Sequence, residues 1–121
     1  DEALEAAAAA ARGRIAFYGS TPGYRMVLEH HGWEDLQTEL NRLMKTRRTD
    51  EMPALITDEI LAKFAVIGAP SEVGPELVRR YGDIVDRMSI QPEGLSDVSL
   101  SELIVSVKTG VEQLKERSAL R

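Results

Sequence analysis

A ten-residue stretch near the N-terminus limits the fold more than any other part of the chain, because it interrupts two helical patterns. It combines three aromatic residues, two hydroxyl residues, two glycines and a proline in the order IAFYGSTPGY, residues 15–24. Gly19 and Ser20 predict a break between helices. Thr21 followed by Pro22 predicts an N-cap and a first turn, because a hydroxyl accepts from a backbone donor and proline has no donor to satisfy there.

Apolar residues recur at helical spacing through most of the chain and predict a mostly α fold. The predicted helices cover residues 2–18, 22–31, 33–45, 58–67, 70–81 and 100–117, with a short capped helix near Leu55 and Ile56. The first helix is rich in alanine, which is typical of a helix that covers something larger. A flexible alanine linker has the same composition and stays an alternative.

Glycine, proline and serine mark the expected helix ends. Gly32 predicts a left-handed C-cap after the second helix. Gly74 and Pro75 predict a kink or a restart within the fifth helix. Ser99 and Glu102 have capping-box spacing and predict the start of the last helix.

Only residues 85–90 have the composition of a strand, and they lie between Gly82 and Gln91-Pro92. One strand cannot form a sheet, because its backbone donors and acceptors need partners that the rest of the chain barely supplies. We therefore expect either a second copy of the chain or residues outside this sequence to pair with it.

Composition excludes several classes of function. The 121 residues include 20 acidic and 15 basic side chains, so the chain has no electrostatic footprint for nucleic acid. With no cysteine, a disulfide framework, a thiolate metal site and a cysteine nucleophile are excluded. No apolar run approaches about 18 residues, so we expect a soluble, cytoplasmic protein outside the membrane. Because the sequence begins with Asp1 and Glu2 inside a helical pattern, we expect it to be part of a longer chain.

A histidine pair and a basic run could suggest a metal site and a phosphate site, but both have ordinary structural explanations. His30 and His31 are adjacent, so on a helix they point about 100° apart and cannot both bind one ion unaided. We therefore expect no metal site. Lys45, Arg47 and Arg48 lie where a helix ends, and interaction with its terminal carbonyls explains them more economically than a phosphate site.

Two clusters of polar side chains are candidates for chemistry. The first comprises Phe17, Tyr18, Ser20, Thr21 and Tyr24. The second lies near the end of the predicted strand and comprises Arg87, Ser89 and Gln91. Helix caps, aromatic packing and ion pairs are the structural alternatives for these residues. No hydrolytic triad or phosphate-binding glycine loop is recognisable.

Several motifs together resemble a known family. They are residues 15–24, LEHHGW at 28–33, TDE at 57–59, GAP at 68–70 and DRMS at 86–89. AFYGSTP-x-Y followed by HGW is similar to the C-terminal part of a luciferase-like monooxygenase, and most similar to the branch that uses the deazaflavin coenzyme F-420. We treat residues 1–121 as a single segment, in which residues 1–90 resemble the family and residues 91–121 form a linker and a closing helix.

The resemblance implies a (β/α)8 barrel, which takes about 250 residues, so this chain would be its last part. It also implies an oxidoreductase that passes a hydride between a substrate carbon and a deazaflavin, or a monooxygenase that uses reduced FMN and oxygen. Tyr18, Ser20 and Thr21 are the candidate cofactor-binding residues. Because earlier loops would supply much of the site, we expect this chain alone to be inactive and to bind neither cofactor. A small-molecule substrate, of open identity, is expected only for the full-length form.

The alternative is a non-catalytic helical module that self-associates. The predicted strand and the apolar faces that a complete barrel would cover both need partners, so we expect a homo-oligomer, most simply a dimer. These faces comprise Leu36, Leu40 and Leu43, then Ile60, Phe64 and Ile67, and the alanines of the first helix.

Overall fold

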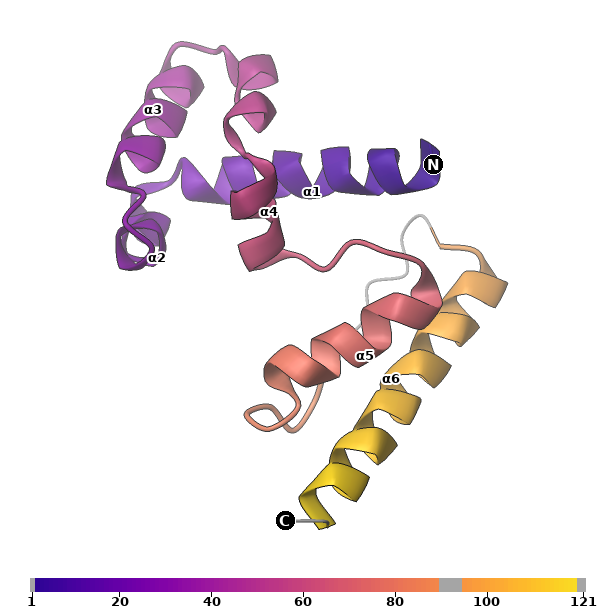
Figure 1. The fold of residues 1–121 in the computed structure, drawn as a ribbon. Coiled ribbons are helices and arrows are strands. Elements are labelled where there is room, and N and C mark those ends of the chain that lie inside the picture. Colours follow the sequence, from indigo (N-terminus) through magenta and orange to yellow (C-terminus); the bar gives the residue numbers. More distant parts are fainter. Residues whose placement is uncertain (1, 90–94, 120–121) are drawn as a thin grey trace. The chain divides into compact units, whose positions relative to one another are not determined.

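The computed structural model describes residues 2–89 and 95–119, and these are mostly helical (Figure 1). The elements are α1 (Glu2–Gly19), η1 (Pro22–Tyr24), α2 (Arg25–His30), α3 (Glu34–Lys45), η2 (Thr49–Glu51), η3 (Pro53–Leu55), α4 (Asp58–Phe64), α5 (Pro70–Tyr81) and α6 (Asp97–Ala119), where η denotes a 3-10 helix. They form two compact units, Asp1–Ala65 and Val66–Arg121. No helix in the described ranges is both long enough and apolar enough to cross a membrane.

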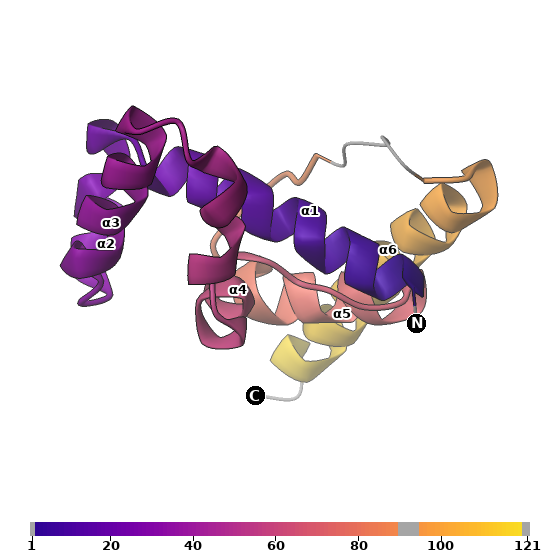
Figure 2. The same ribbon diagram turned by 90° about the horizontal axis from the view of Figure 1, so that it is seen from above.

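In the first unit, the other elements pack around α1. Helices α2 and α3 lie at its C-terminal end, and η3 and α4 cross it nearer its middle (Figures 1 and 2). The buried core comprises Ala16, Leu40, Leu43, Met52, Ile56, Ile60 and Leu61. Arg12 joins α1 to the start of α4, because its Nε donates to the Ile56 carbonyl at 3.0 Å and its guanidinium pairs with Asp58.

The predicted C-cap at Gly32 is confirmed. Gly32 has a φ of +78° and its N–H donates to the Glu29 carbonyl at 2.9 Å, while the Trp33 N–H donates to the Leu28 carbonyl at 2.9 Å. These two bonds are the Schellman motif that closes a helix. They turn the chain sharply, so α3 can fold back beside α2.

In the second unit, α5 and α6 pack side by side and run in the same direction. A Cβ added to Gly74 would lie 2.1 Å from the Ser106 Oγ, and one added to Gly110 would lie 3.1 Å from Cγ2 of Val78. Contacts thus repeat every four residues along both helices. Glycine and serine at these positions let the two backbones come close.

The predicted strand is wrong. Residues 85–89 are irregular, and Ile90 lies outside the described residues. The N–H groups of Ile84 and Val85 both donate to the Tyr81 carbonyl at 3.0 Å, so the segment begins as a turn at the end of α5. The described residues offer this segment no partner strand, and an unpaired strand leaves its backbone groups unsatisfied.

Some helix boundaries also differ from the prediction. The helix expected at 22–31 is split into η1 and α2, and the helix expected at 58–67 ends at Phe64 because Ala65 is extended. Of the kink or restart expected at Gly74 and Pro75, the restart is wrong, because α5 is continuous from Pro70 to Tyr81, and the kink stays a prediction. Pro75 removes one hydrogen bond near the N-terminus of α5, and packing against α6 holds the helix together.

The last helix begins at Asp97, three residues before the predicted start. The Ser99 N–H donates to the Ser96 Oγ at 3.1 Å, so Ser96 caps α6. The predicted capping box at Ser99 and Glu102 is therefore wrong, because Ser99 already lies inside the first turn.

The apolar faces predicted to need a partner are only partly covered: Ile67 is 38% exposed and most alanines of α1 stay exposed, whereas residues of α3 and α4 are covered. Leu40, Leu43 and Ile60 are buried in the core of the first unit, and Phe64 is half-buried against it. These residues pack on one another and on α1, so their burial needs no second copy.

Candidate functional site

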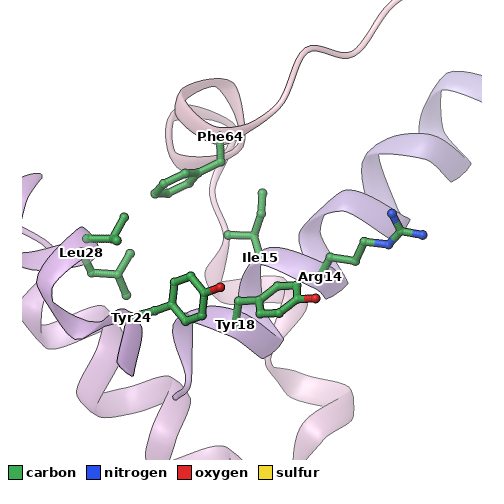
Figure 3. A pocket seen from close by; sticks show the side chains of 8 residues that line it. Arg14, Ile15, Tyr18, Tyr24, Leu28 and Phe64 are labelled. Atoms are coloured by element: carbon green, nitrogen blue, oxygen red, sulfur yellow. The ribbon is translucent and has the colours of Figure 1, made fainter. Parts of the chain in front are cut away.

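A cavity of about 280 Å³ lies beside the C-terminal half of α1, entirely within the first unit (Figure 3). Its lining residues come from α1, η1, α2 and α4 and comprise Arg14, Ile15, Tyr18, Gly19, Tyr24, Val27, Leu28 and Phe64. Apart from Arg14 and the hydroxyls of the two tyrosines, these side chains are apolar. The lining itself is almost wholly apolar, and these polar groups lie at its rim, so the cavity suits an apolar ligand.

Helix spacing and a short turn create this cavity. Arg14 and Tyr18 are four residues apart on α1, so they share one face of the helix. The break at residues 20–24 then brings Tyr24 back beside Tyr18, with ring centroids 5.4 Å apart and an interplanar angle of 56°. Leu28 of α2 and Phe64 of α4 lie across from this pair (Figure 3).

The three predicted site residues are placed differently from one another. Tyr18 lines the cavity and is 52% exposed, whereas Ser20 is 1% exposed and Thr21 is not part of the lining. The Ser20 Oγ donates to the Phe17 carbonyl at 2.6 Å, and the Thr21 Oγ1 donates to the Tyr18 carbonyl at 2.8 Å. Both hydroxyls thus close the C-terminal end of α1. The predicted N-cap bond of Thr21 is wrong, because the hydroxyl turns back to the preceding helix.

The turn is held in place by polar residues that the sequence analysis missed. The Ser20 carbonyl accepts from the Gln37 Nε2 at 3.3 Å and the Asn41 Nδ2 at 3.0 Å. Arg25 in turn donates to the Gln37 Oε1 at 2.7 Å. Gln37 and Asn41 are four residues apart, on the same side of the helix and beside the buried Leu40. This spacing of two amide side chains next to a core position could have indicated that they bond a buried backbone group. Together they fix the turn that positions Tyr24.

Phe17 lies outside the cavity although its neighbour Tyr18 lines it. Phe17 is 55% exposed and borders a separate hollow of about 350 Å³, with Gly13, Met44 and Met52 among its other lining residues. The two adjacent aromatics are thus similarly exposed and border different hollows, although their rings meet in a T-shaped contact with centroids 5.6 Å apart.

The tandem histidines belong to an aromatic cluster. His31 stacks on Trp33 with centroids 4.8 Å apart, and the rings of His31 and Phe64 form a T-shaped pair with centroids 5.6 Å apart. His30 packs edge-on against His31 at 5.3 Å. Within residues 2–89 and 95–119, no three acidic, histidine or cysteine side chains gather as a metal site would require.

The remaining charged candidates lie on the surface. Arg48 pairs with Glu51, its Nη2 donating to the Glu51 Oε1 at 2.7 Å, which lowers the pKa of that carboxyl. Arg87 and Ser89 are exposed in the irregular segment after α5. Gln91 lies outside the described residues.

Comparison with known proteins identifies the family. The model of the luciferase-like monooxygenase family matches residues 1–87. The uncharacterized proteins Mb1395 of Mycobacterium bovis, and Rv1360 and MT1405 of Mycobacterium tuberculosis, are each 50% identical to this chain over 88 residues. That segment covers 73% of this chain and 26% of each relative, so the chain spans about a quarter of the length of the curated relatives that it matches. No solved structure matches the chain.

The matched residues 1–87 make up well over half of the chain and contain every residue that lines the cavity. This chain therefore belongs to the luciferase-like monooxygenase family.

Proposed function

We propose that this chain is the C-terminal segment of the barrel of a luciferase-like oxidoreductase, and that its cavity forms part of that enzyme's binding surface. The enzyme would use the deazaflavin coenzyme F-420 or FMN, which supplies the redox chemistry while the protein positions the reactants. The observation that carries this proposal is the family match over residues 1–87, which includes the whole cavity.

The cavity does not fit a complete flavin or deazaflavin. Its volume of about 280 Å³ lies at the small end of ligand sites, whereas either cofactor carries a three-ring system and a phosphorylated side chain. We therefore assign no reaction step to this chain, and we expect the chain alone to bind neither cofactor and to be inactive.

Tyr18 is the residue we propose as the cofactor contact. At 52% exposure its ring borders the cavity and also faces solvent, where other parts of a longer enzyme would bring a cofactor. Ser20 and Thr21 contribute indirectly, because their hydroxyls bond the carbonyls of Phe17 and Tyr18 and so fix the backbone that carries Tyr18.

A chimera tests this proposal. The 88-residue matched segment of Rv1360 is replaced by the corresponding residues of this chain, and FMN and coenzyme F-420 are titrated into Rv1360, the chimera and the 121-residue chain. We expect Rv1360 and the chimera to bind the same cofactor with Kd values within about tenfold of each other, and the chain alone to bind neither.

Three results would overturn the proposal. They are a chimera that does not fold or does not bind, a folded Rv1360 that binds neither cofactor, and retention of either cofactor by the 121-residue chain after gel filtration.

A second candidate function is self-association as a helical module. Several large apolar side chains are strongly exposed, among them Met26 at 78%, Ile84 at 72% and Val98 at 68%. Burying them against a second copy would remove apolar surface from water. Light scattering at micromolar concentration should then report about twice the 13.4 kDa chain mass, and a monomer would argue against this candidate.

A further inference from the structure

The lining of the cavity indicates the charge of its ligand. Arg14 is the only charged residue among the lining residues, and none of them is acidic. Leu28 and Phe64 form the walls opposite (Figure 3), and Val27 also lines the cavity, so the lining favours an apolar body. A ligand that matches both features has an apolar part and a negative charge.

The polar groups at the edge of the cavity have no partners of their own in the described part of the chain. The phenol hydroxyls of Tyr18 and Tyr24 make no hydrogen bond there, and Arg14 makes no ion pair. Arg12, only two residues earlier, is by contrast held by Ile56 and Asp58. Two hydroxyl donors and one guanidinium are thus available to a ligand at the rim of the cavity, outside its almost wholly apolar lining.

These groups are arranged on one side. In Figure 3 the hydroxyl oxygens of Tyr18 and Tyr24 lie on the side of their rings that faces Arg14. The stem of Arg14 lines the cavity, and its guanidinium extends toward solvent, as long basic side chains commonly do. A carboxylate at this edge can accept from a phenol hydroxyl and pair with the guanidinium when Arg14 turns toward it.

The volume sets the size of the apolar part. About 280 Å³ accommodates a single ring with a short side chain more readily than a polycyclic ligand. The tilted tyrosine pair and Phe64 offer aromatic faces and edges to such a ring.

We propose that this cavity is a binding site for a small aryl carboxylate, with the ring between the tyrosine pair and Phe64 and the carboxylate at Arg14. As the substrate class of an enzyme, this assignment rests on the proposed function. The binding itself depends only on residues of the first unit, so it can be tested without a flavin or a longer chain.

The test compares two probes of similar shape. 3-Phenylpropionate and the neutral 3-phenylpropan-1-ol are titrated into the 121-residue chain, and amide and aromatic NMR shifts are followed. We expect both to shift cavity resonances, with the carboxylate binding about fivefold more tightly, as expected for an ion pair at a partly exposed site. Equal affinities, or shifts confined to residues outside the cavity, would overturn the proposal.

Matched variants separate the charge from the ring. Arg14→Gln should remove the preference for the carboxylate, whereas Lys45→Gln, which removes an exposed charge at the end of α3, should keep it. Tyr18→Phe should weaken the carboxylate more than the alcohol, because it removes a hydroxyl that bonds a carboxylate more strongly than a neutral oxygen and keeps the ring. An unchanged preference in folded Arg14→Gln would contradict the role of this residue. The flavin titrations of the chimera use neither probe, so failure of one proposal is distinguishable from failure of the other.

Discussion

Arg47 occupies a backbone conformation that favours glycine. Its φ is 60°, and it ends α3 with the same bond pattern that Gly32 gives α2, since the Arg48 N–H donates to the Leu43 carbonyl at 2.9 Å. A side chain in this left-handed region costs free energy that glycine does not. The chain thus carries one favourable and one strained version of the same helix end.

Replacing Arg47 with glycine should therefore stabilise the first unit by about 0.5–1 kcal/mol. Urea unfolding followed by the fluorescence of Trp33, which lies in this unit, measures the change. Gly32→Ala is the matched control and should destabilise by about 1 kcal/mol, because its φ of +78° is then strained. A loss of stability in Arg47→Gly would mean that the exposed Arg47 side chain contributes a contact that outweighs the strain.

At the level of elements, the α5–α6 pair depends on close approach at Gly74. A Cβ there would lie 2.1 Å from the Ser106 Oγ and 2.4 Å from the Ser106 carbonyl carbon, so the helices would have to separate. We expect Gly74→Ala to destabilise the second unit by about 1–3 kcal/mol, seen as an earlier loss of helical circular dichroism on heating.

Gly13→Ala is the control for this substitution. Gly13 lies inside α1 with nothing within 4 Å of an added Cβ, so alanine should stabilise that helix by about 0.5–1 kcal/mol. Glycine-to-alanine substitution should thus lower the stability of the α5–α6 pair and raise that of α1. Equal melting behaviour of the two variants would contradict the packing described for α5 and α6.

Local sequence patterns predicted where helices form better than they predicted which distant segments pair or pack together. The start of α5 at Pro70 and the C-cap at Gly32 followed from proline and glycine chemistry, which acts over a few residues. The strand at 85–90 was wrong because strand formation depends on pairing with distant residues. Ser96 was missed as a cap because Ser99 and Glu102 have capping-box spacing, whereas Ser96 is followed three residues later by Ser99 instead of Glu or Gln.

The cavity was only partly predictable, because it also depends on contacts between residues far apart in the sequence. The sequence pointed to Tyr18 and Tyr24 as members of one cluster, because they lie in one unusual stretch. It gave no sign that Phe64, forty residues beyond Tyr24 on α4, would face them, since that depends on how α4 crosses α1. Arg14 was hidden within an ordinary helical pattern.

At the scale of the whole molecule, the family match and the cavity come together in residues 1–65. The cavity lies in the unit Asp1–Ala65, which the match over residues 1–87 contains completely. We propose that this surface contributes to ligand binding in a luciferase-like oxidoreductase, with Tyr18 as one of its contacts. The adjacent Phe17 has a nearly equal exposure, 55% against 52%, but lies outside the cavity. The two residues therefore provide a matched comparison.

The most direct measurement is the cofactor Kd of the Rv1360 chimera carrying Tyr18→Ala or Phe17→Ala. We predict that Tyr18→Ala weakens cofactor binding at least about tenfold, as expected for loss of an aromatic contact at a binding surface, and that Phe17→Ala changes it less than about twofold. Folding of both variants is checked by circular dichroism. Equal Kd values for the two folded variants would contradict the assignment of this cavity to the binding surface.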